Sequence, residues 1–355
     1  MPFWDVETRV PRDLDDWRDS IREACRWMTE CSMMRSSACA VDGEFAHGSR
    51  YRDWRGAFRG EYRAAMRQWD VYAPIWHGGQ GVKALALASR ALGDAKLLDE
   101  AEYAAGFLLR HQVTGTDSDD EDNGLLLAYE NNAINVSAIV EAIDGLLVLS
   151  EISGEPRYAE VAVAAARWAM RRSYRPADGS FLYVYDPDAR RFLPPRCMAD
   201  GRLIDRGPLL DDGVFVKVYQ LTGERAFLDV AVGVAERLLT EEDPPGNWAR
   251  FPPNDPVTRT CHPRTAYWYG RPMWMVARAT GDERFLACAR RAAEWYAGAM
   301  RLDGGMFRST APDFRTPSFD HATSGIACAA ILWLELAQEC GDSGWDGHLA
   351  RALHY

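Results

Sequence analysis

SRALGDAKLLDEA, residues 89–101, contains the phrase that decides the fold. Related phrases recur as SEISGEPRYAEVA at 150–162, YQLTGERAFLDVA at 219–231 and ARATGDERFLACA at 277–289, with a weaker copy, AQECGDSGWDGHLA, at 337–350. Their glycines, Gly93, Gly154, Gly223, Gly281 and Gly341, are 61, 69, 58 and 60 residues apart. This spacing is that of two helices with their loops, so each phrase indicates the turn of a helical hairpin.

Each phrase combines a helix end with a helix start. Glycine adopts the left-handed conformation that ends a helix, and the Asp or Glu after it places negative charge at the next helix start. Apolar residues spaced by three and four flank the turns, as in VSAIVEAIDGLLVLSEI before Gly154. The first helix of each pair is the more apolar, so we expect it to lie inside. The repeat predicts an all-α fold, an (α/α)6 barrel, whose inner helices begin near Trp76, Asn132, Leu210, Thr265 and Asp320.

The first 70 residues lack the glycine phrase. We expect residues 13–34 and the amphipathic stretch DWRGAFRGEYRAAMRQW, 53–69, to form a sixth helical hairpin. SFLYVYDP at 180–187 predicts a β-hairpin. No composition shift marks a linker, so we expect one domain, 1–355, in which 1–70 is a less regular first hairpin.

The composition excludes several classes of function. A net charge of −11 disfavours nucleic acid as a partner. No stretch is apolar for long enough to cross a membrane, and the start lacks the pattern of a secretory signal, so we expect a cytoplasmic protein. The eight cysteines form no CxxC pair and indicate reduced packing residues. We expect a monomer or homodimer without a cofactor.

Polar residues concentrate in the segments that would enter the inner helices. In a ring of antiparallel helices these segments gather at one end, where converging polar groups predict a binding site. The segments are YAPIWHGGQG (72–81), AYENNAINVSA (128–138), DRGPLLDDGVF (205–215), CHPRTAYWYGRPMW (261–274) and DFRTPSFDHATSG (313–325).

Paired carboxylates, Asp211 and Asp212, begin an inner helix that continues with apolar GVFVKVY. Cleavage of a sugar bond needs one carboxyl group that stays protonated, and burial beside a like charge raises its pKa. Capping of the helix start is the structural alternative, and it suits Asp211 better than Asp212. We therefore expect Asp212 to be the principal catalytic residue.

The preceding inner helix offers a second carboxylate. Glu130 enters it, together with Asn132 and Asn135, whose amides could orient sugar hydroxyls; capping needs only one asparagine. Asp144 lies three turns further along among apolar residues, where it either faces the central cavity or bonds to a neighbouring helix. Both alternatives remain open.

The remaining candidates bind substrate. His77, His262 and His321 lie in the entering segments, and histidine transfers protons near neutral pH, although most single histidines are structural. Arg264 and Arg271 share a helix face two turns apart and could hold a substrate carboxylate or pair with inner acids. Further candidates for contact with a carbohydrate are Trp76, Gln80, Tyr267, Trp268 and Trp274.

The acidic segment at 117–130 approximates a calcium loop. Its ligand positions would be Asp119, Glu121, Asn123 and Glu130, with Gly124 at the sharp turn. A Glu stands at the third position and no paired loop exists, so we favour a solvated acidic loop and expect no metal.

Several of these segments resemble the six-hairpin glycosidases, and in particular the unsaturated glucuronyl and rhamnogalacturonyl hydrolases. LLDDGVFVKVYQLTGERAFLD resembles their catalytic inner-helix start with Asp212 in the matching position, and YWYGRPMW resembles their R-G-x-x-W helix through Arg271 and Trp274. SFDHATSGIACAAILWLELA resembles their closing helix. The resemblance implies a glycoside hydrolase in which Asp212 donates a proton, Glu130 or Asp144 assists, and Arg264, Arg271 or Lys217 holds a uronic acid carboxylate.

Other functions remain in competition. NAINVSAIVEAIDGLLVLSEISGEPRY is similar to a helix of the N-acylglucosamine 2-epimerases, although Ser137 or a neighbour replaces their histidine. A sugar epimerase or isomerase would use His77, His262 or His321. A barrel that binds without catalysis and a metal-dependent lyase or cyclase are the remaining hypotheses.

Overall fold

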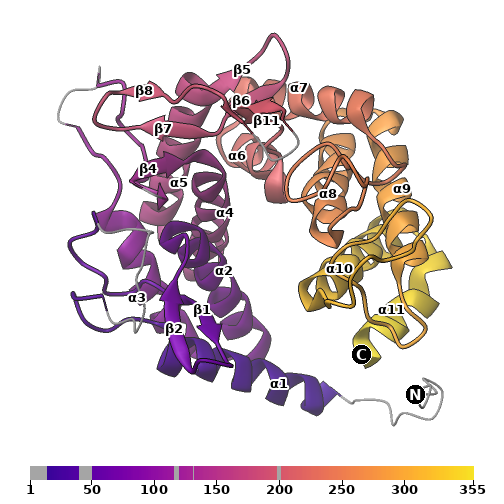
Figure 1. The fold of residues 1–355 in the computed structure, drawn as a ribbon. Coiled ribbons are helices and arrows are strands. Elements are labelled where there is room, and N and C mark those ends of the chain that lie inside the picture. The colour runs from indigo at the N-terminus through magenta and orange to yellow at the C-terminus, as the bar shows by residue number, and fades with distance from the viewer. Residues whose placement is uncertain (1–13, 40–49, 116–119, 131, 198–200) are drawn as a thin grey trace. The chain divides into compact units, whose positions relative to one another are not determined.

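Two compact units make up the described part of the chain. The computed structural model describes residues 14–39, 50–115, 120–130, 132–197 and 201–355. Of these residues, 14–209 and 220–223 belong to the N-terminal unit, and 210–219 and 224–355 belong to the C-terminal unit. Helices account for most of both units, and the strands are short (Figure 1).

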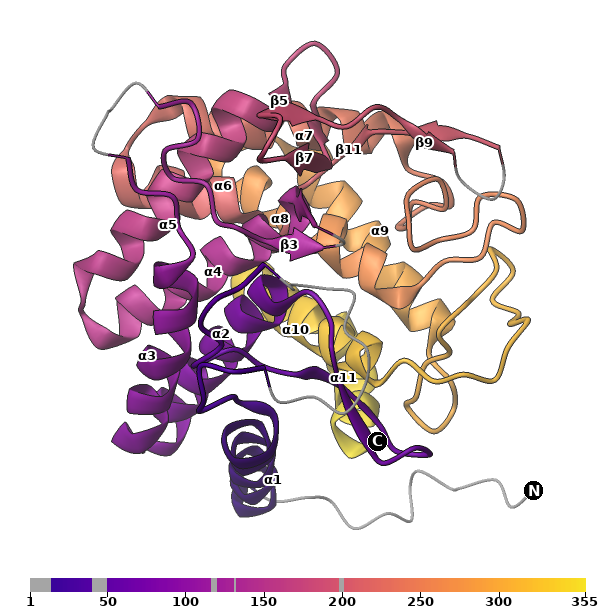
Figure 2. The ribbon, with the colours of Figure 1, turned by 60° about the vertical axis from the view of Figure 1, so that its left-hand side comes forward.

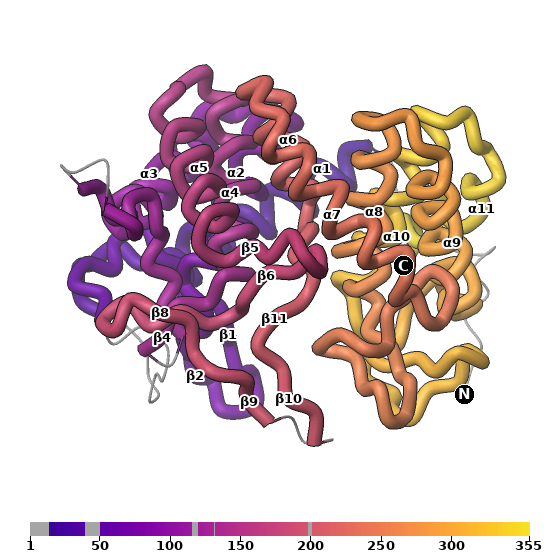
Figure 3. Tube along the Cα trace, turned by 90° about the horizontal axis from the view of Figure 1, so that it is seen from above, coloured from indigo at the N-terminus to yellow at the C-terminus, as the bar shows by residue number. Residues whose placement is uncertain are grey.

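Helical hairpins α2–α3 and α4–α5 contain most of the helical residues of the N-terminal unit (Figure 3). Helix α2 packs against α3 and α4, and α4 packs against α5. Helices α1 and α5 each continue into a π-helical turn. The bounds are α1 Leu14–Arg26, η2 Trp27–Ser32, α2 Pro74–Leu92, α3 Ala95–Arg110, α4 Val136–Ser153, α5 Pro156–Trp168 and η3 Ala169–Ser173.

Short antiparallel sheets connect these helices. Their strand orders are β1-β2, β3-β4-β7-β8, β11-β6-β5 and β10-β9. Residues 180–182 and 184–186 form strands, but these strands, β6 and β7, join different sheets and pair in two separate hairpins, β5–β6 and β7–β8. The bounds are β1 Gly60–Arg63, β2 Gln68–Val71, β3 Tyr129–Glu130, β4 Ala133–Asn135, β5 Tyr174–Arg175, β6 Ser180–Leu182, β7 Val184–Asp186, β8 Arg191–Phe192, β9 Arg196–Cys197, β10 Leu203–Ile204 and β11 Arg206–Gly207.

The C-terminal unit is built around α8. Helix α8 packs against α9 and α10, and α10 packs against α11 (Figure 2). A short 3-10 turn, η4, precedes α6 and contacts α8. The bounds are η4 Asp211–Gly213, α6 Val214–Thr222, α7 Arg225–Glu241, α8 Pro263–Thr280, α9 Glu283–Ala299, α10 Thr323–Cys340, η5 Ser343–Trp345 and α11 Asp346–His354.

The predicted glycine turns are confirmed. Each one ends a helix in the left-handed conformation, and an added Cβ would meet no atom within 4 Å at any of them. These positions therefore require glycine for its φ angle and not for space. The φ angles are 67° at Gly93, 75° at Gly154, 72° at Gly223, 76° at Gly281 and 67° at Gly341.

A different use of glycine brings α2 and α4 together. A Cβ on Gly79 would lie 2.5 Å from the Cα atom of Ala142, and a Cβ on Gly145 would lie 2.1 Å from the carbonyl oxygen of Gly79. Distances this short leave no room for a side chain. The backbones of these two helices therefore approach as closely as they do because both positions are glycine.

The predicted helix at 53–69 is wrong. Gly56 and Gly60 have φ angles of 84° and 86°, which a right-handed helix cannot contain, and the segment turns into the β1–β2 hairpin. The apolar spacing that suggested a helix has another origin, because the ring of Trp69 in β2 packs 5.2 Å from that of Trp27.

Within the residues that the structure covers, we find no helix that combines the length and the apolar character of a membrane span.

The two kinds of glycine should respond differently to substitution. Gly281→Ala should lower the free energy of unfolding by about 1–2 kcal/mol, the cost of a left-handed conformation for an L residue. Gly79→Ala should lower it further, because the new methyl group collides with the α4 backbone. Urea denaturation measures both. Gly281→Asn is the control and should lose less than Gly281→Ala, since Asn tolerates this conformation; a larger loss at Gly281 than at Gly79 would contradict the distinction.

Candidate functional site

Asp211 and Asp212 form a buried carboxyl pair in η4. Both residues are less than 10 % exposed, at 7 % and 6 %. Asp212 has a φ of 52°, a left-handed conformation that is uncommon for residues other than glycine. Gly213 follows with a φ of 62°, and a Cβ there would lie 2.4 Å from Sδ of Met275. The chain therefore holds Asp212 in a strained conformation, a feature that concentrates at functional sites.

Arg271 in α8 connects the pair to a third acid. Its Nη1 donates to Oδ1 of Asp212 at 3.2 Å, while Nε and Nη2 donate to the carboxylate of Glu335 in α10 at 2.6–2.9 Å. The hydroxyl of Tyr267 lies 3.3 Å from the same Oδ1, and its ring lies under the guanidinium. Burial lowers the pKa of Arg271, but Tyr267, Glu335 and Asp212 together raise it above its ordinary value. Arg271 is thus engaged by protein acids.

The environment of Asp211 favours its protonated form. Burial, and then the neighbouring charge of Asp212, raise the pKa of Asp211 to about 7. A carboxyl group with this pKa carries a proton over much of the range in which ordinary aspartates are ionised. The pair can therefore offer both a protonated carboxyl group, which can act as an acid, and a neighbouring carboxylate, which can act as a base.

The two predicted histidines of the C-terminal unit have other partners. His262 precedes α8 and accepts a hydrogen bond from the backbone NH of Arg264 at 3.1 Å. Burial, followed by the charges of Arg264 and Arg308, lowers the pKa of His262 to about 4. The exposed His321 lies against Arg301 and the hydroxyl of Tyr355, at 2.7 and 3.1 Å. Both contacts suit structural roles.

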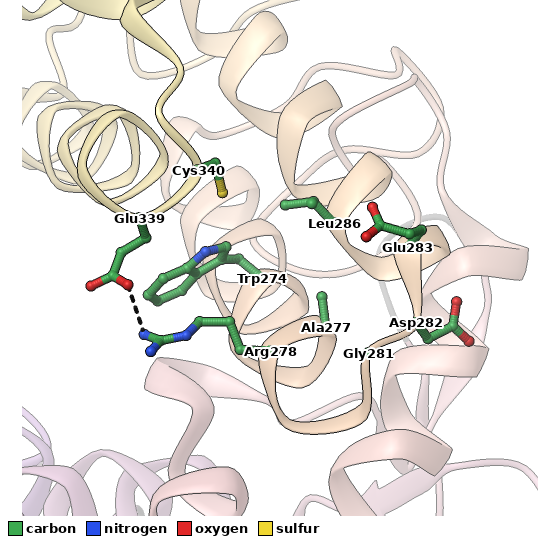
Figure 4. Close-up of a pocket in the computed structure, with 9 residues that line it drawn as sticks. All are labelled: Trp274, Ala277, Arg278, Gly281, Asp282, Glu283, Leu286, Glu339 and Cys340. Atoms are coloured by element: carbon green, nitrogen blue, oxygen red, sulfur yellow. Dashed lines mark ion pairs between the residues drawn. The ribbon is translucent and has the colours of Figure 1, made fainter.

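The three predicted aromatic residues of α8 have different surroundings. Tyr267 touches Asp212, and Trp268 is half-buried on the face that also carries Arg264 and Arg271. Trp274 lines a pocket of about 180 Å³ beside the Gly281 turn, where Arg278 and Glu339 form an ion pair (Figure 4). Neither Asp212 nor Arg271 lines that pocket.

A second buried charge cluster lies between α2 and α4 in the N-terminal unit. Lys83 Nζ is 2.6 Å from Oδ2 of Asp144, which is 1 % exposed. One turn earlier on each helix, Gln80 lies 3.4 Å from the buried Glu141. Of the two alternatives that the sequence left open for Asp144, the structure therefore shows the bond to a neighbouring helix.

The other predicted residues of the N-terminal unit lie at the start of α4 and α2. Asn135 caps α4 by accepting from the NH of Ser137 at 3.0 Å, and its amide donates to Glu130 in β3. Asn132 occupies the β3–β4 turn with a φ of 66°. In α2, the rings of Trp76 and His77 stack with centroids 5.6 Å apart. Their assignment to substrate or catalysis remains a prediction.

The acidic segment is held by cations of the protein. Glu121 pairs with Arg172 at 2.6 Å, Asp120 pairs with Arg190, and the buried Asp122 accepts from the hydroxyl of Tyr185 at 2.6 Å. A strand, not a helix, ends the segment at Glu130. Asp119 lies outside the described residues. Across the described ranges, no group of three or more His, Cys, Asp or Glu side chains is placed to hold a metal.

Sequence reasoning missed Lys83, Glu141 and Glu335. One signal could have found the first of these, because Lys83, Asp144 and Arg271 each lie ten residues before the glycine that ends their helix. Asp212 lies eleven residues before its glycine. Glu335, six residues before Gly341, follows no such rule and required the structure.

Comparison with known proteins gives the fold. No family profile and no curated protein matches the sequence. The solved structure of cellobiose 2-epimerase from Bacillus thermoamylovorans is 10 % identical, covers 96 % of this chain and 86 % of its own, and has a TM-score of 0.65. A D-mannose isomerase is 12 % identical with 97 % and 87 % covered and a TM-score of 0.64. An unsaturated glucuronyl hydrolase from Streptococcus agalactiae is 13 % identical with 98 % and 81 % covered and a TM-score of 0.59.

These proteins are (α/α)6-barrel enzymes of the six-hairpin glycosidase superfamily, which includes both glycoside hydrolases and sugar epimerases or isomerases. The predicted all-α fold class and the resemblance in fold are confirmed.

Stability should depend on pH through Asp211. Its pKa is about 7 in the folded chain and about 3.9 when unfolded, so its contribution is fully present below pH 4 and is lost as pH rises through 7. The free energy of unfolding should therefore fall between pH 4 and 8 by a few kcal/mol more in the parent chain than in Asp211→Asn. Urea denaturation across this range measures the difference. Parallel pH profiles would contradict a raised pKa.

The bidentate ion pair between Arg271 and Glu335 should appear as a coupling energy between these two residues. Arg271→Met leaves the buried Asp212 and the half-buried Glu335 without their cation and should cost about 3 kcal/mol of stability. In a double-mutant cycle with Glu335→Gln, the coupling energy should be about 1–3 kcal/mol. The exposed pair Arg225 and Asp229 is the matched control and should show much weaker coupling. If the losses of stability in the two single variants simply add in the double variant, the ion pair between Arg271 and Glu335 does not contribute as predicted.

Proposed function

We propose that this protein is a glycoside hydrolase that cleaves an oligosaccharide, including one that ends in an unsaturated uronic acid. The observation that carries the proposal is the buried pair Asp211–Asp212, in which Asp212 has a left-handed conformation and contacts Arg271 and Tyr267. Pairs of carboxyl groups perform this reaction because one supplies a proton and the other acts as base or nucleophile.

We assign to Asp212 the transfer of a proton to the substrate, and the proton reaches it from the neighbouring Asp211, whose raised pKa keeps a proton in the pair. Two adjacent buried carboxyl groups cannot both ionise at low cost, so the pair retains one proton near neutral pH. The proton passes to the leaving-group oxygen as the glycosidic bond breaks. The oxygen of a water molecule bonds to the anomeric carbon, and that water molecule gives one proton back to the carboxyl pair. On an unsaturated uronide the proton goes instead to the ring double bond, and hydration gives a hemiketal that collapses.

Arg271 and Tyr267 position this acid. Both donate toward Oδ1 of Asp212, and Glu335 fixes the guanidinium from the other side through two nitrogens. A reacting group must be held within a fraction of an ångström of its working position, and side chains bonded on two sides are held in this way. These contacts support Arg271 as a positioning residue and not as the anchor of a substrate carboxylate.

A sugar epimerase is the second candidate. The observation in its favour is the likeness to cellobiose 2-epimerase, with a TM-score of 0.65 over 96 % of this chain. Against it, His77, His262 and His321 each have a polar partner in the protein, and the pKa of His262 is lowered to about 4. A histidine that titrates so low is a weak base at neutral pH.

Asp212→Asn should reduce kcat for oligosaccharide cleavage by about 10²–10⁴-fold, the usual contribution of a positioned acid. The substrates to screen are oligosaccharides, including fragments made by polysaccharide lyases. Asp282→Asn, which changes an aspartate that caps α9, is the control and should retain activity. Circular dichroism verifies that the helices persist.

Two outcomes would contradict the proposal. Full activity of Asp212→Asn excludes it as the acid. Incorporation of deuterium from heavy water into an unbroken sugar, without any cleavage, identifies an epimerase or isomerase, because that reaction exchanges a carbon-bound hydrogen and hydrolysis does not.

A further inference from the structure

Arg264 and Arg308 differ from the other charged residues near the start of α8. In a chain with 52 acidic and 41 basic residues, neither arginine has a carboxylate within 4 Å among the residues that the structure describes. Arg271, on the same face of α8, has two such partners. An arginine that lacks an acid in an acidic protein is available for an anion from outside.

Backbone pairing brings the two arginines to the same place. Cys261 and Thr310 exchange both backbone hydrogen bonds, at 2.8 and 3.0 Å, so the segment that carries Arg308 lies beside the start of α8. The guanidinium of Arg264 donates through Nε to the hydroxyl of Ser324 in the first turn of α10, at 2.9 Å. This bond fixes the orientation of Arg264 and uses only one of its three nitrogens.

His262 is within electrostatic reach of both arginines and does not offset their charge. The positive charges of both arginines reach the imidazole, and together with burial they hold its pKa at about 4, so the ring is neutral at pH 7. The same place holds the starts of α8 and α10, whose free backbone NH groups carry partial positive charge. No capping side chain satisfies the start of α10 from the N-cap Ala322. Each of these features favours a negatively charged ligand.

We propose that Arg264 and Arg308 bind the anionic group, a carboxylate or a phosphate, of a sugar ligand. The proposal rests on the proposed function to the extent that the ligand is taken to be a sugar. Guanidinium groups suit either anion because their paired NH donors match its oxygens.

The position of the arginines defines which sugar unit carries the anion. Arg264 precedes Arg271 by seven residues, which is about 10 Å along a helix. Arg271 contacts the proposed acid, so Arg264 lies about two helical turns from the residue that touches Asp212. Trp268 lies between the two arginines on the same helix face, where its half-buried ring is available to the intervening unit. The anion is therefore expected on a neighbouring unit and not on the sugar that reacts.

Calorimetric titration of the full chain with glucuronate, glucose 6-phosphate, inorganic phosphate and glucose tests the proposal. An anionic sugar should bind at least tenfold more tightly than glucose. Arg308→Gln and Arg264→Gln should each remove about a tenfold preference while leaving the affinity for glucose unchanged. Arg308 is exposed and its side chain bonds to no acid, so its variant tests the site without disturbing the packing of α8 and α10. Arg225→Gln, which removes an exposed arginine elsewhere in the unit, is the matched control.

The probes distinguish the two anions. Tight binding of inorganic phosphate and glucose 6-phosphate assigns a phosphate, and a preference for glucuronate assigns a carboxylate; either result supports the site. Bound anion should also raise the pKa of His262, which nuclear magnetic resonance of the imidazole detects. Equal affinities for glucose and the anionic sugars, unchanged in both variants, would overturn the proposal. The titration measures binding and not turnover. A protein that hydrolyses no oligosaccharide would therefore contradict the proposed function without changing the conclusion on anion binding.

Discussion

The left-handed glycine at the end of each first helix is the constraint on which the helical pairs depend. Gly93, Gly154, Gly281 and their counterparts have φ angles that other residues adopt at a cost, and they face open space. The turn therefore fixes where each helix ends. Because an α-helix has a constant rise, the end also sets the depth of every residue that precedes it. The charged residues Lys83 and Arg271 lie at equal distances from their turns for this reason.

Charged side chains about ten residues before the helix-ending glycines lie inside the helical pairs and need partners of opposite charge. The two units provide these partners in different ways. In the N-terminal unit, Lys83 and Asp144 form an ion pair between neighbouring helices, and Gln80 lies beside the buried Glu141 one turn earlier. In the C-terminal unit, Arg271 serves both Asp212 and Glu335, and Asp211 adds a fourth ionisable group with a raised pKa. A structural ion pair needs no strained residue. The cluster of the C-terminal unit contains the strained Asp212 and, in Asp211, a carboxyl group with a raised pKa, which is why it carries the proposed chemistry.

Arg264 and Arg271 in α8 have different proposed roles because they have different partners. Arg271 is bonded to protein acids, whereas Arg264 uses a single nitrogen on Ser324. A sequence shows both as cations on one helix face and cannot distinguish them. The histidines illustrate the same point, since His262 caps a helix, and burial, followed by the charges of Arg264 and Arg308, lowers its pKa to about 4. The chemistry available to a side chain is set by what the fold places around it.

The sequence alone determined the helical hairpins, their turns and the fold class, because these depend on local φ preference and on apolar periodicity. It also named Asp211, Asp212 and Arg271 as candidate site residues, and their role stays a prediction. The sequence wrongly predicted a helix at 53–69. Gly56 and Gly60 have φ angles that a helix cannot contain, and Trp69, which contributed to the apolar pattern, packs from a strand against Trp27. Only the tertiary structure decided that Glu335 joins Arg271 and that Asp144 joins Lys83, because such contacts join helices far apart in the chain. Burial and charge pairing are properties of the packed helices, and no single helix contains them.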